Sequence, residues 1–299
     1  MRIDPNLVPA LLAGLQQSQL SLNAALEQVS TGKSVNEPSD NPSAAADMVQ
    51  NTIETGDVDQ YTQNVNSVLT TVQSADSTLS SVVASLTKAV SLGTEGANGI
   101  NSAAEQQDLA TQVQGIFSSV LAAANTSVGG AYLFGGTSTG IPYTADSSSA
   151  TGYTYNGNDD SNSVQIGDQT SVQFNLPGSQ VFSNSTNDVL GSLNSLVTAL
   201  QSGNSSTIAT ATSAVDSSVN YISQQQVFYG DAESQLNSQQ SFLQQDTVTL
   251  ASQENNLVGV NEAAAATELS QAETDNNAAL AAMAKVLPNS LLNFLAPPQ

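Results

Sequence analysis

The 299-residue sequence predicts a mainly α protein: a long, coiled-coil-like helical bundle rod built from both chain ends, with a small β insert domain in the middle. Two hydrophobic repeats predict the bundle, because apolar residues in each half of the chain recur at the spacing of coiled-coil helices. The middle of the chain predicts the insert, because residues 135–187 are rich in Gly, Ser, Thr, Asn, Asp and Tyr and contain short alternating runs.

The first segment, residues 6–30, is expected to form an amphipathic helix, and so is the last, at about 262–287. Polar residues interrupt both apolar stripes, at Gln19 and Asn276. Neither helix would bury much apolar area alone, so both are expected to become ordered only when they find partners. The stripes are Val8, Leu12, Leu15, Leu22, Leu26 and Val29 in the first helix, and Ala263, Ala266, Leu269, Ala272, Leu280, Met283 and Val286 in the last.

The longest unbroken stripe predicts one long helix that ends at a loop containing Gly93, Gly96 and Gly99. A second run with the same spacing, from Leu109 to Ala124, predicts a helix that returns antiparallel to the first. The stripe of the long helix consists of Val58, Tyr61, Val65, Val68, Val72, Ala75, Leu79, Val82, Leu86 and Ala89.

The second half of the chain mirrors this arrangement. A short helix is expected at roughly 188–202, and apolar residues then fall at every seventh position from Ile208 to Ala264. The companion positions are polar, as at Ser218 and Gln225, so this helix offers only a narrow apolar seam. It is therefore expected to be one member of a bundle rather than a stand-alone dimeric coiled coil.

Two hairpin-turn dipeptides organise the expected β insert. Asn156-Gly157 and Gly167-Asp168 are both flanked by residues that favour strands. The run NGNDDSN resembles a Ca²⁺ loop but lacks the positioned Gly and terminal Glu of an EF-hand, so we expect a solvated turn.

The composition excludes several classes of function. Only 4 Lys and Arg stand against 26 Asp and Glu, a formal net charge of −22, so the chain cannot coat a phosphate backbone or an anionic membrane surface. There is no His and no Cys, which removes thiolate, zinc-site and Ser-His-Asp chemistry. We therefore expect no enzyme activity, no metal, no cofactor, and neither a nucleic acid nor a membrane as partner.

The most unusual segment is STGKSVNEPSDNPSAAA. Gly32 and Pro38 break the helix, and Ser39 or Asp40 could cap the next one. By composition alone the segment is a loop between two helices. It holds Lys33, a rare cation that is either solvated or in contact with an acidic surface on a neighbouring subunit.

At this segment the chain resembles a known family. The run VSTGKSVNEPSDNPSAAADM is similar to the signature that follows the first helix in the flagellin family. Further along, GGAYLFGGTSTGIPYT and the ending LAAMAKVLPNSLLNFL resemble the branch of this family that joins the flagellar hook to the filament. The resemblance covers nearly the whole chain in the same order.

The resemblance implies a structural subunit of the bacterial flagellum that forms the junction ring connecting the hook to the flagellin filament. It implies self-association into a ring of about eleven copies, since head-to-tail contacts build rings or tubes. The other implied partners are a hook-side junction protein, flagellin, and a cytoplasmic export chaperone at the C-terminal helix. It also implies type III export without a cleaved signal peptide, and an extracellular place in the flagellum.

Three domains are expected. Residues 1–49 with 263–299 would form a terminal helical assembly domain that is disordered in the monomer, residues 50–134 with 189–262 the helical bundle rod, and residues 135–188 the β insert. By resemblance, packing of the inner tube is carried by the terminal domain. The expected interface residues are Leu7, Leu11, Leu15, Leu22, Leu287, Leu291, Leu292 and Leu295, together with Lys33, Asn36 and Asp40 of the loop.

Three other functions stay open at this point. The chain could be flagellin itself, the filament subunit, which would polymerise without another protein. It could be a secreted adhesin whose β insert binds a glycan or a host protein. An enzyme acting on a polysaccharide through Asp159 or Asp160 is the weakest hypothesis, because adjacent strand residues face opposite ways and cannot share one site.

Overall fold

The computed structural model describes residues 7–295 of the chain, with the side chains of residues 9–285. The chain divides into two compact units: Val58–Gln244, and the residues on either side, up to Asp57 and from Gln245 onward. The architecture is mainly α with a small strand-containing region in the middle, as the sequence predicts. Two long helices, α2 (Pro42–Ala97) and α6 (Ser205–Val258), contribute residues to both units.

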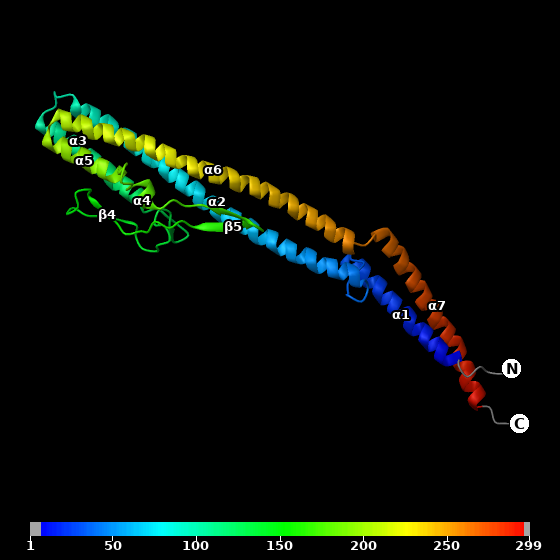
Figure 1. The fold of residues 1–299 in the computed structure, drawn as a ribbon. Helices are drawn as coiled ribbons and strands as arrows, with labels where there is room; N and C mark the ends of the chain where they lie inside the picture. Colours follow the sequence, from blue (N-terminus) through cyan, green and yellow to red (C-terminus); the bar gives the residue numbers. More distant parts are fainter. Residues whose placement is uncertain (1–6, 296–299) are drawn as a thin grey trace. The chain divides into compact units, whose positions relative to one another are not determined.

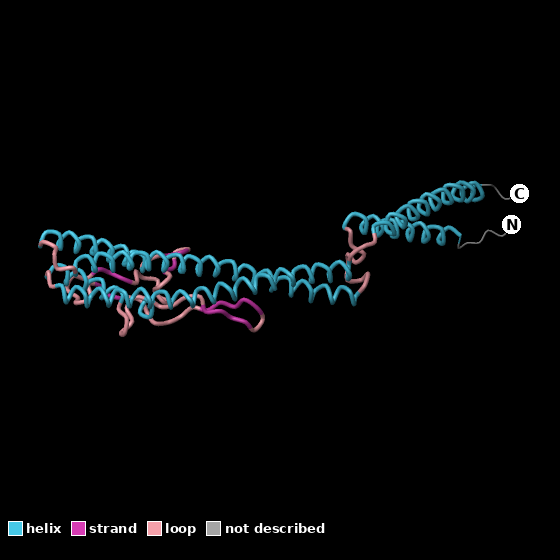
Figure 2. The backbone as a smooth tube through the Cα atoms, turned by 90° about the horizontal axis from the view of Figure 1, so that it is seen from above, coloured by secondary structure: helices cyan, strands magenta, loops and turns pink. Residues whose placement is uncertain are grey.

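Within the unit Val58–Gln244, α2 and α6 lie side by side, and α3 (Ala103–Ala124) and α5 (Val189–Ser202) pack beside them (Figures 1 and 2). The predicted stripe of α2 forms the core: nine of its ten residues are buried, and Tyr61 is partly exposed. In α6 the predicted residues from Ile208 to Leu243 are buried as well. Apolar residues that recur every three or four positions thus form a seam on each helix, and the two seams pack against each other.

Local signals end and begin these helices. Ser102 caps α3 through a capping box, in which its hydroxyl accepts from the Glu105 backbone N–H and the Glu105 carboxylate accepts from the Ser102 N–H. Gly203 ends α5 in the left-handed conformation, at φ 71°. The Asn204 side chain then accepts from the first backbone N–H groups of α6, at Ser206 and Thr207.

The expected end of the long helix is wrong. Gly93 and Gly96 lie inside α2, which continues to Ala97, and only Gly99, at φ +70°, lies in the turn beyond it. The two helical glycines are buried where α5 and α6 approach: a side chain on Gly93 would overlap Thr212, and one on Gly96 would overlap Leu200. They allow close helix packing here and do not break the helix.

The strand-containing region consists of three separate antiparallel hairpins. Gly167-Asp168 lies at the turn of the last hairpin, as predicted. Asn156-Gly157 does not form a hairpin turn: it follows β4, whose pairing with β3 is closed by residues 146–152. The strands are β1 (Ser127–Val128), β2 (Ala131–Tyr132), β3 (Tyr143–Ala145), β4 (Tyr153–Tyr155), β5 (Ser163–Gly167) and β6 (Thr170–Gln173), and a short helix, α4 (Gly178–Val181), follows them.

Aromatic packing and polar contacts attach these hairpins to the helices. The Tyr143 ring lies 6.0 Å from that of Phe182 and 4.8 Å from that of Tyr155, between centroids. The Tyr153 hydroxyl donates to the carboxylate of Asp188, 3.0 Å away, and the same oxygen accepts from the Gly191 N–H in the first turn of α5. Asp188 therefore joins β4 to the start of α5 as well as capping that helix.

Candidate functional site

The unit outside Val58–Gln244 is built from α1 (Leu7–Thr31), α7 (Glu262–Leu295), the start of α2 and the end of α6. Helices α1 and α7 lie side by side and antiparallel (Figures 1 and 2). Both present a seam at coiled-coil spacing. The seam of α1 contains Leu11, Leu15, Ser18, Leu22 and Ala25, and that of α7 contains Ala265, Leu269, Ala272, Asn276, Ala279 and Met283.

These seams differ from the stripes expected from the sequence. Leu12, Leu26 and Val29 of α1 are exposed, as are Ala263, Ala266 and Leu280 of α7. The reason is that polar or small residues, such as Ser18 and Asn276, occupy seam positions, so the pattern of apolar residues alone does not follow the contact line.

The contact between α1 and α7 is thin. A groove of about 540 Å³ runs between them, bordered by small residues such as Gly14 and Ala272 and by longer polar ones such as Gln17 and Glu268. The Ser18 hydroxyl is buried there and has no hydrogen-bond partner among the described residues. Since hydrophobic stabilisation follows the apolar area buried, Ala and Ser at these positions stabilise the pair less than buried Leu and Ile side chains stabilise the long bundle.

Large apolar side chains instead point outward from this unit. Leu12 and Leu20 of α1 are 52% and 58% exposed. The start of α2 and the end of α6 add others, so that the exposed set consists of Leu12, Leu20, Leu26, Val29, Val49, Ile53, Val248 and Leu280. Single exposed apolar residues are ordinary, and these eight leave apolar area of this unit open to solvent in the isolated chain.

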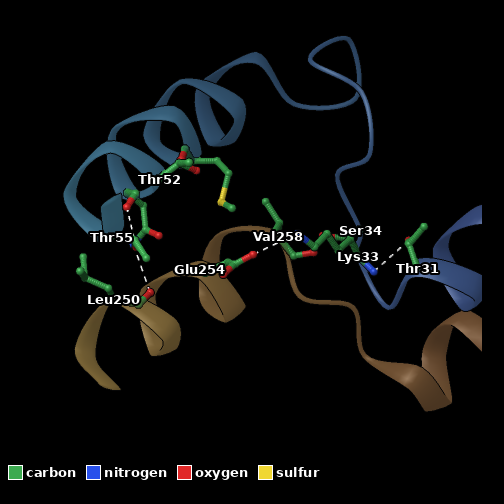
Figure 3. Close-up of polar contacts among 10 residues, drawn as sticks. Thr31, Lys33, Ser34, Thr52, Thr55, Leu250, Glu254 and Val258 are labelled. Carbon is green, nitrogen blue, oxygen red and sulfur yellow. Dashed lines mark hydrogen bonds and ion pairs between the residues drawn. The ribbon is translucent and has the colours of Figure 1, made fainter. Parts of the chain in front are cut away.

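The loop after α1 is tied to the connection between α6 and α7 (Figure 3). The Ser34 N–H donates to the Val258 carbonyl at 2.6 Å, and the Val260 N–H donates to the Gly32 carbonyl at 3.1 Å. Gly32 adopts φ +69°, a conformation that other residues rarely adopt, and so turns the chain out of α1. These bonds join two segments that are more than two hundred residues apart in the sequence.

Lys33 strengthens the same junction. Its ammonium donates to Glu254 of α6 at 3.0 Å, and both side chains are partly exposed (Figure 3). An ion pair of this exposure contributes about 0–1 kcal/mol. The partner that the structure shows for Lys33 is therefore within its own chain, and the sequence could not show this pairing because Glu254 lies in the other half.

Asp40 organises the loop and does not cap the next helix. Its carboxylate accepts from the backbone N–H groups of Glu37 and Asn36, at 2.9 and 3.0 Å, and these bonds hold the pKa of Asp40 below its usual value. The cap of α2 is Asn41, whose side chain accepts from the Ala44 N–H, which corrects the expectation for Ser39 or Asp40. The Asn36 amide completes the loop by donating to the Lys33 carbonyl.

One buried residue of this unit was missed in the sequence. The Asn51 side chain of α2 is buried and donates to the Leu250 carbonyl of α6 at 3.1 Å. A polar side chain in the seam fixes which turns of two helices face each other. The signal available in the sequence was Asn51 itself, which stands seven residues before Val58, at a seam position of the stripe.

The expected interface residues whose side chains the structure describes lie in this unit. Leu11, Leu15 and Leu22 are partly buried against α7, and the three loop residues take part in the hydrogen bonds above. The side chains of the others, Leu7, Leu287, Leu291, Leu292 and Leu295, lie outside the described residues. A role for any of them in assembly stays a prediction.

The described residues hold no cluster of acidic side chains arranged to bind a metal ion. Within the same residues, no helix has the length and apolar character needed to cross a bilayer. What this unit offers is a set of helical surfaces and the loop after α1, residues 32–41, which we call the tied loop.

Comparison with known proteins identifies the family. A family model of the bacterial flagellin N-terminal helical region matches residues 7–139, and one of the C-terminal helical region matches residues 212–295. The chain belongs to the flagellin family. The matched regions contain α1, α7, the tied loop and most of the long bundle.

Among curated proteins, the chain is similar to flagellar hook-associated protein 3 of two bacteria. It is 30% identical to the Salmonella typhimurium protein over 180 residues, which are 60% of this chain and 56% of the relative. The Escherichia coli protein is 31% identical over 180 residues, which again are 60% of this chain and 56% of the relative. The alignments thus span a little over half the length of these relatives.

Solved structures show the same fold. A structure described as a flagellar hook-associated protein from Vibrio parahaemolyticus matches 74% of this chain and all of its own, with a TM-score of 0.68 and 18% identity. FlgL of Bacillus cereus matches 70% of this chain and 99% of its own, with a TM-score of 0.58 and 21% identity.

Proposed function

We propose that this chain is a structural subunit of the bacterial flagellum that forms a junction ring between the hook and the flagellin filament. The single observation that carries the proposal is the unit formed by α1 and α7. Its internal seam includes small residues and a groove, whereas eight of its large apolar side chains face outward. Membership of the flagellin family and the similarity to hook-associated protein 3 support the flagellar role.

The physical logic is that assembly completes this unit. Ala and Ser side chains in the seam leave the terminal helices weakly held in the monomer. Neighbouring copies would cover Leu12 and Leu20 and so supply the apolar burial that the seam lacks. Contacts made head to tail between different faces build rings or tubes, which is the form that a junction requires.

The finer parts of the proposal follow from the family resemblance. They include a ring of about eleven copies, contacts with a hook-side junction protein and with flagellin, a cytoplasmic chaperone on the C-terminal helix, and type III export to the extracellular flagellum. The division into a terminal assembly domain, a rod and an insert belongs to the proposal too, as does disorder of the terminal domain in the monomer.

The test compares two exposed surfaces of one chain. Full burial of a Leu side chain contributes about 1.5–3 kcal/mol, and about half of that remains available at Leu12 and Leu20, so their burial together would add about 2–3 kcal/mol. The double variant Leu12→Gln, Leu20→Gln should therefore weaken association about 30- to 150-fold. A matched control is Val227→Gln, because Val227 is 59% exposed but lies in the other unit.

Association is measured by sedimentation and electron microscopy of the purified chain mixed with the hook-side junction protein and flagellin of the same bacterium. The unchanged chain and the Val227→Gln control should form rings and nucleate filaments, and the double variant should do neither. Equal assembly of the double variant would refute the role of this surface.

A second candidate, the filament subunit, is favoured by the family models, which describe flagellin itself. The same experiment separates the two functions. Long filaments formed by this chain alone would establish the filament subunit and refute the junction ring.

A further inference from the structure

The chain contains two Asn-Gly pairs, Asn98-Gly99 and Asn156-Gly157, and the proposed function uses neither of them. Asn-Gly is the dipeptide in which a side-chain amide is most easily attacked by the backbone nitrogen that follows it, because glycine has no side chain to obstruct the approach. The two pairs are both at exposed asparagines, but their surroundings differ.

We propose that Asn98 is a site of spontaneous modification, at which the side-chain amide is converted to a carboxyl group through a cyclic imide formed with Gly99, whereas Asn156 is protected by its contacts. The reaction needs no enzyme and only water as a co-reactant. It is independent of the proposed function.

The chemistry has two steps. The Gly99 backbone nitrogen bonds to Cγ of Asn98, the bond from Cγ to Nδ2 breaks, and the proton lost by the Gly99 nitrogen is taken up through solvent by the leaving group, which departs as ammonia. Water then adds to either carbonyl of the five-membered imide, and the bond from that carbonyl to nitrogen breaks. The product is aspartate or its isomer, in which the backbone passes through the side chain.

The surroundings of Asn98 permit this attack. Helix α2 ends at Ala97, so Asn98 and Gly99 lie beyond its regular hydrogen bonding. Gly99 is exposed, and an atom placed at its Cβ position would have nothing within 4 Å. Among the described residues, neither the Asn98 side chain nor the Gly99 N–H has a hydrogen-bond partner, and only the Asn98 backbone N–H is held, by the Glu95 carbonyl at 3.3 Å.

The surroundings of Asn156 oppose the same attack. Its side-chain nitrogen donates to the Thr144 hydroxyl at 3.1 Å, and its backbone N–H donates to the Pro142 carbonyl at 2.7 Å. Gly157 is covered by the Tyr155 phenol, which an added Cβ would overlap. The amide of Asn156 cannot turn toward the Gly157 nitrogen until the bond to Thr144 is broken.

The modification would alter the tip of the bundle. It places a negative charge at the C-terminal end of α2, where the helix dipole disfavours anions. The Asn101 side chain donates to the Glu95 carbonyl at 2.7 Å in the same turn. The turn between α2 and α3 should therefore become less well held in protein that has aged.

The experiment follows both sites in one sample. The folded full-length chain is kept in warm, mildly alkaline buffer, and peptides are mapped by mass spectrometry that separates the aspartate isomers. Because the two hydrogen bonds of Asn156 together correspond to about a 30-fold factor, modification at Asn98 should be about 30-fold faster than at Asn156. In the chain unfolded by denaturant, the two rates should become similar.

The variant Asn98→Gln is the control, because a longer side chain disfavours the five-membered ring and should leave Asn156 as the slow remaining site. Two results would overturn the proposal. One is equal rates at Asn98 and Asn156 in the folded chain. The other is an unmodified Asn98 in folded protein while the unfolded chain reacts there.

Discussion

Replacing Gly96 by alanine tests the packing of α2 against α5. In a helix interior, alanine is favoured over glycine by about 1 kcal/mol. At Gly96, however, the new Cβ would overlap Leu200 and lie 3.6 Å from both Ile208 Cγ2 and Leu109 Cδ1. All three side chains are buried, so none can move aside, and overpacking of this kind costs about 1–3 kcal/mol. The free energy of unfolding should therefore fall by about 0–2 kcal/mol.

Gly115 provides the matched control. It lies inside α3, is exposed, and has nothing within 4 Å of the added Cβ, so Gly115→Ala should stabilise by about 1 kcal/mol. The two alanine variants should thus differ by about 1–3 kcal/mol, or about 2–12 °C in Tm for a unit of this size. Circular dichroism and calorimetry measure the Tm and the free energy of unfolding of each variant.

A double-mutant cycle makes the test sharper. With Leu200→Ala in the background, the overlap disappears, and Gly96→Ala should then stabilise as Gly115→Ala does. If Gly96→Ala already stabilises the unchanged chain by about 1 kcal/mol, the account of why this glycine is buried in the helix is refuted.

Two further predictions concern the terminal unit. The N–H donors lower the pKa of Asp40 in the folded chain below the ordinary carboxyl pKa of 3.8. The bonds from Asn36 and Glu37 to its carboxylate should therefore persist above pH 3.8 and be lost as the pH falls through the lowered pKa. Amide exchange at Asn36 and Glu37 would show this transition. In Asp40→Asn the same amides should exchange without this acid transition, and an unchanged transition would contradict the assignment. Hydrogen exchange of the isolated chain should also be faster at residues 7–31 and 262–295 than in the core of α2, since the seam is thin, and should slow when partners are added. Equal protection in the isolated chain would contradict weak terminal helices.

The long bundle could be predicted because the spacing of apolar residues along each helix decides which side chains it buries. From Val58 to Ala89 the apolar spacing decides which side chains are buried, and the structure confirms it at all but Tyr61. Apolar spacing failed as a guide where small residues such as glycine form the contact between two helices. Gly96 reads as a helix breaker in the sequence, but its role depends on Leu200, more than a hundred residues away.

The tied loop shows most clearly which contacts the sequence pattern does not indicate. The sequence marks it as unusual, but the partners of Lys33 and Ser34 lie at Glu254 and Val258, and no local pattern indicates them. The choice of Asn41 over Asp40 as the cap was equally hidden. Both residues have suitable side chains, and the difference lies in which backbone N–H groups the folded loop presents to each.

The pairing of the two chain ends also sets an order of events during synthesis. Helix α1 leaves the ribosome before its partner α7 and before the Val258 carbonyl that holds the loop. At about 5–20 residues per second, the roughly 230 residues between α1 and α7 take on the order of 10–50 s to translate. For that time α1 has no intramolecular partner to fold against. A nascent chain of this protein therefore displays an unpaired amphipathic segment to whatever binding protein reaches it first.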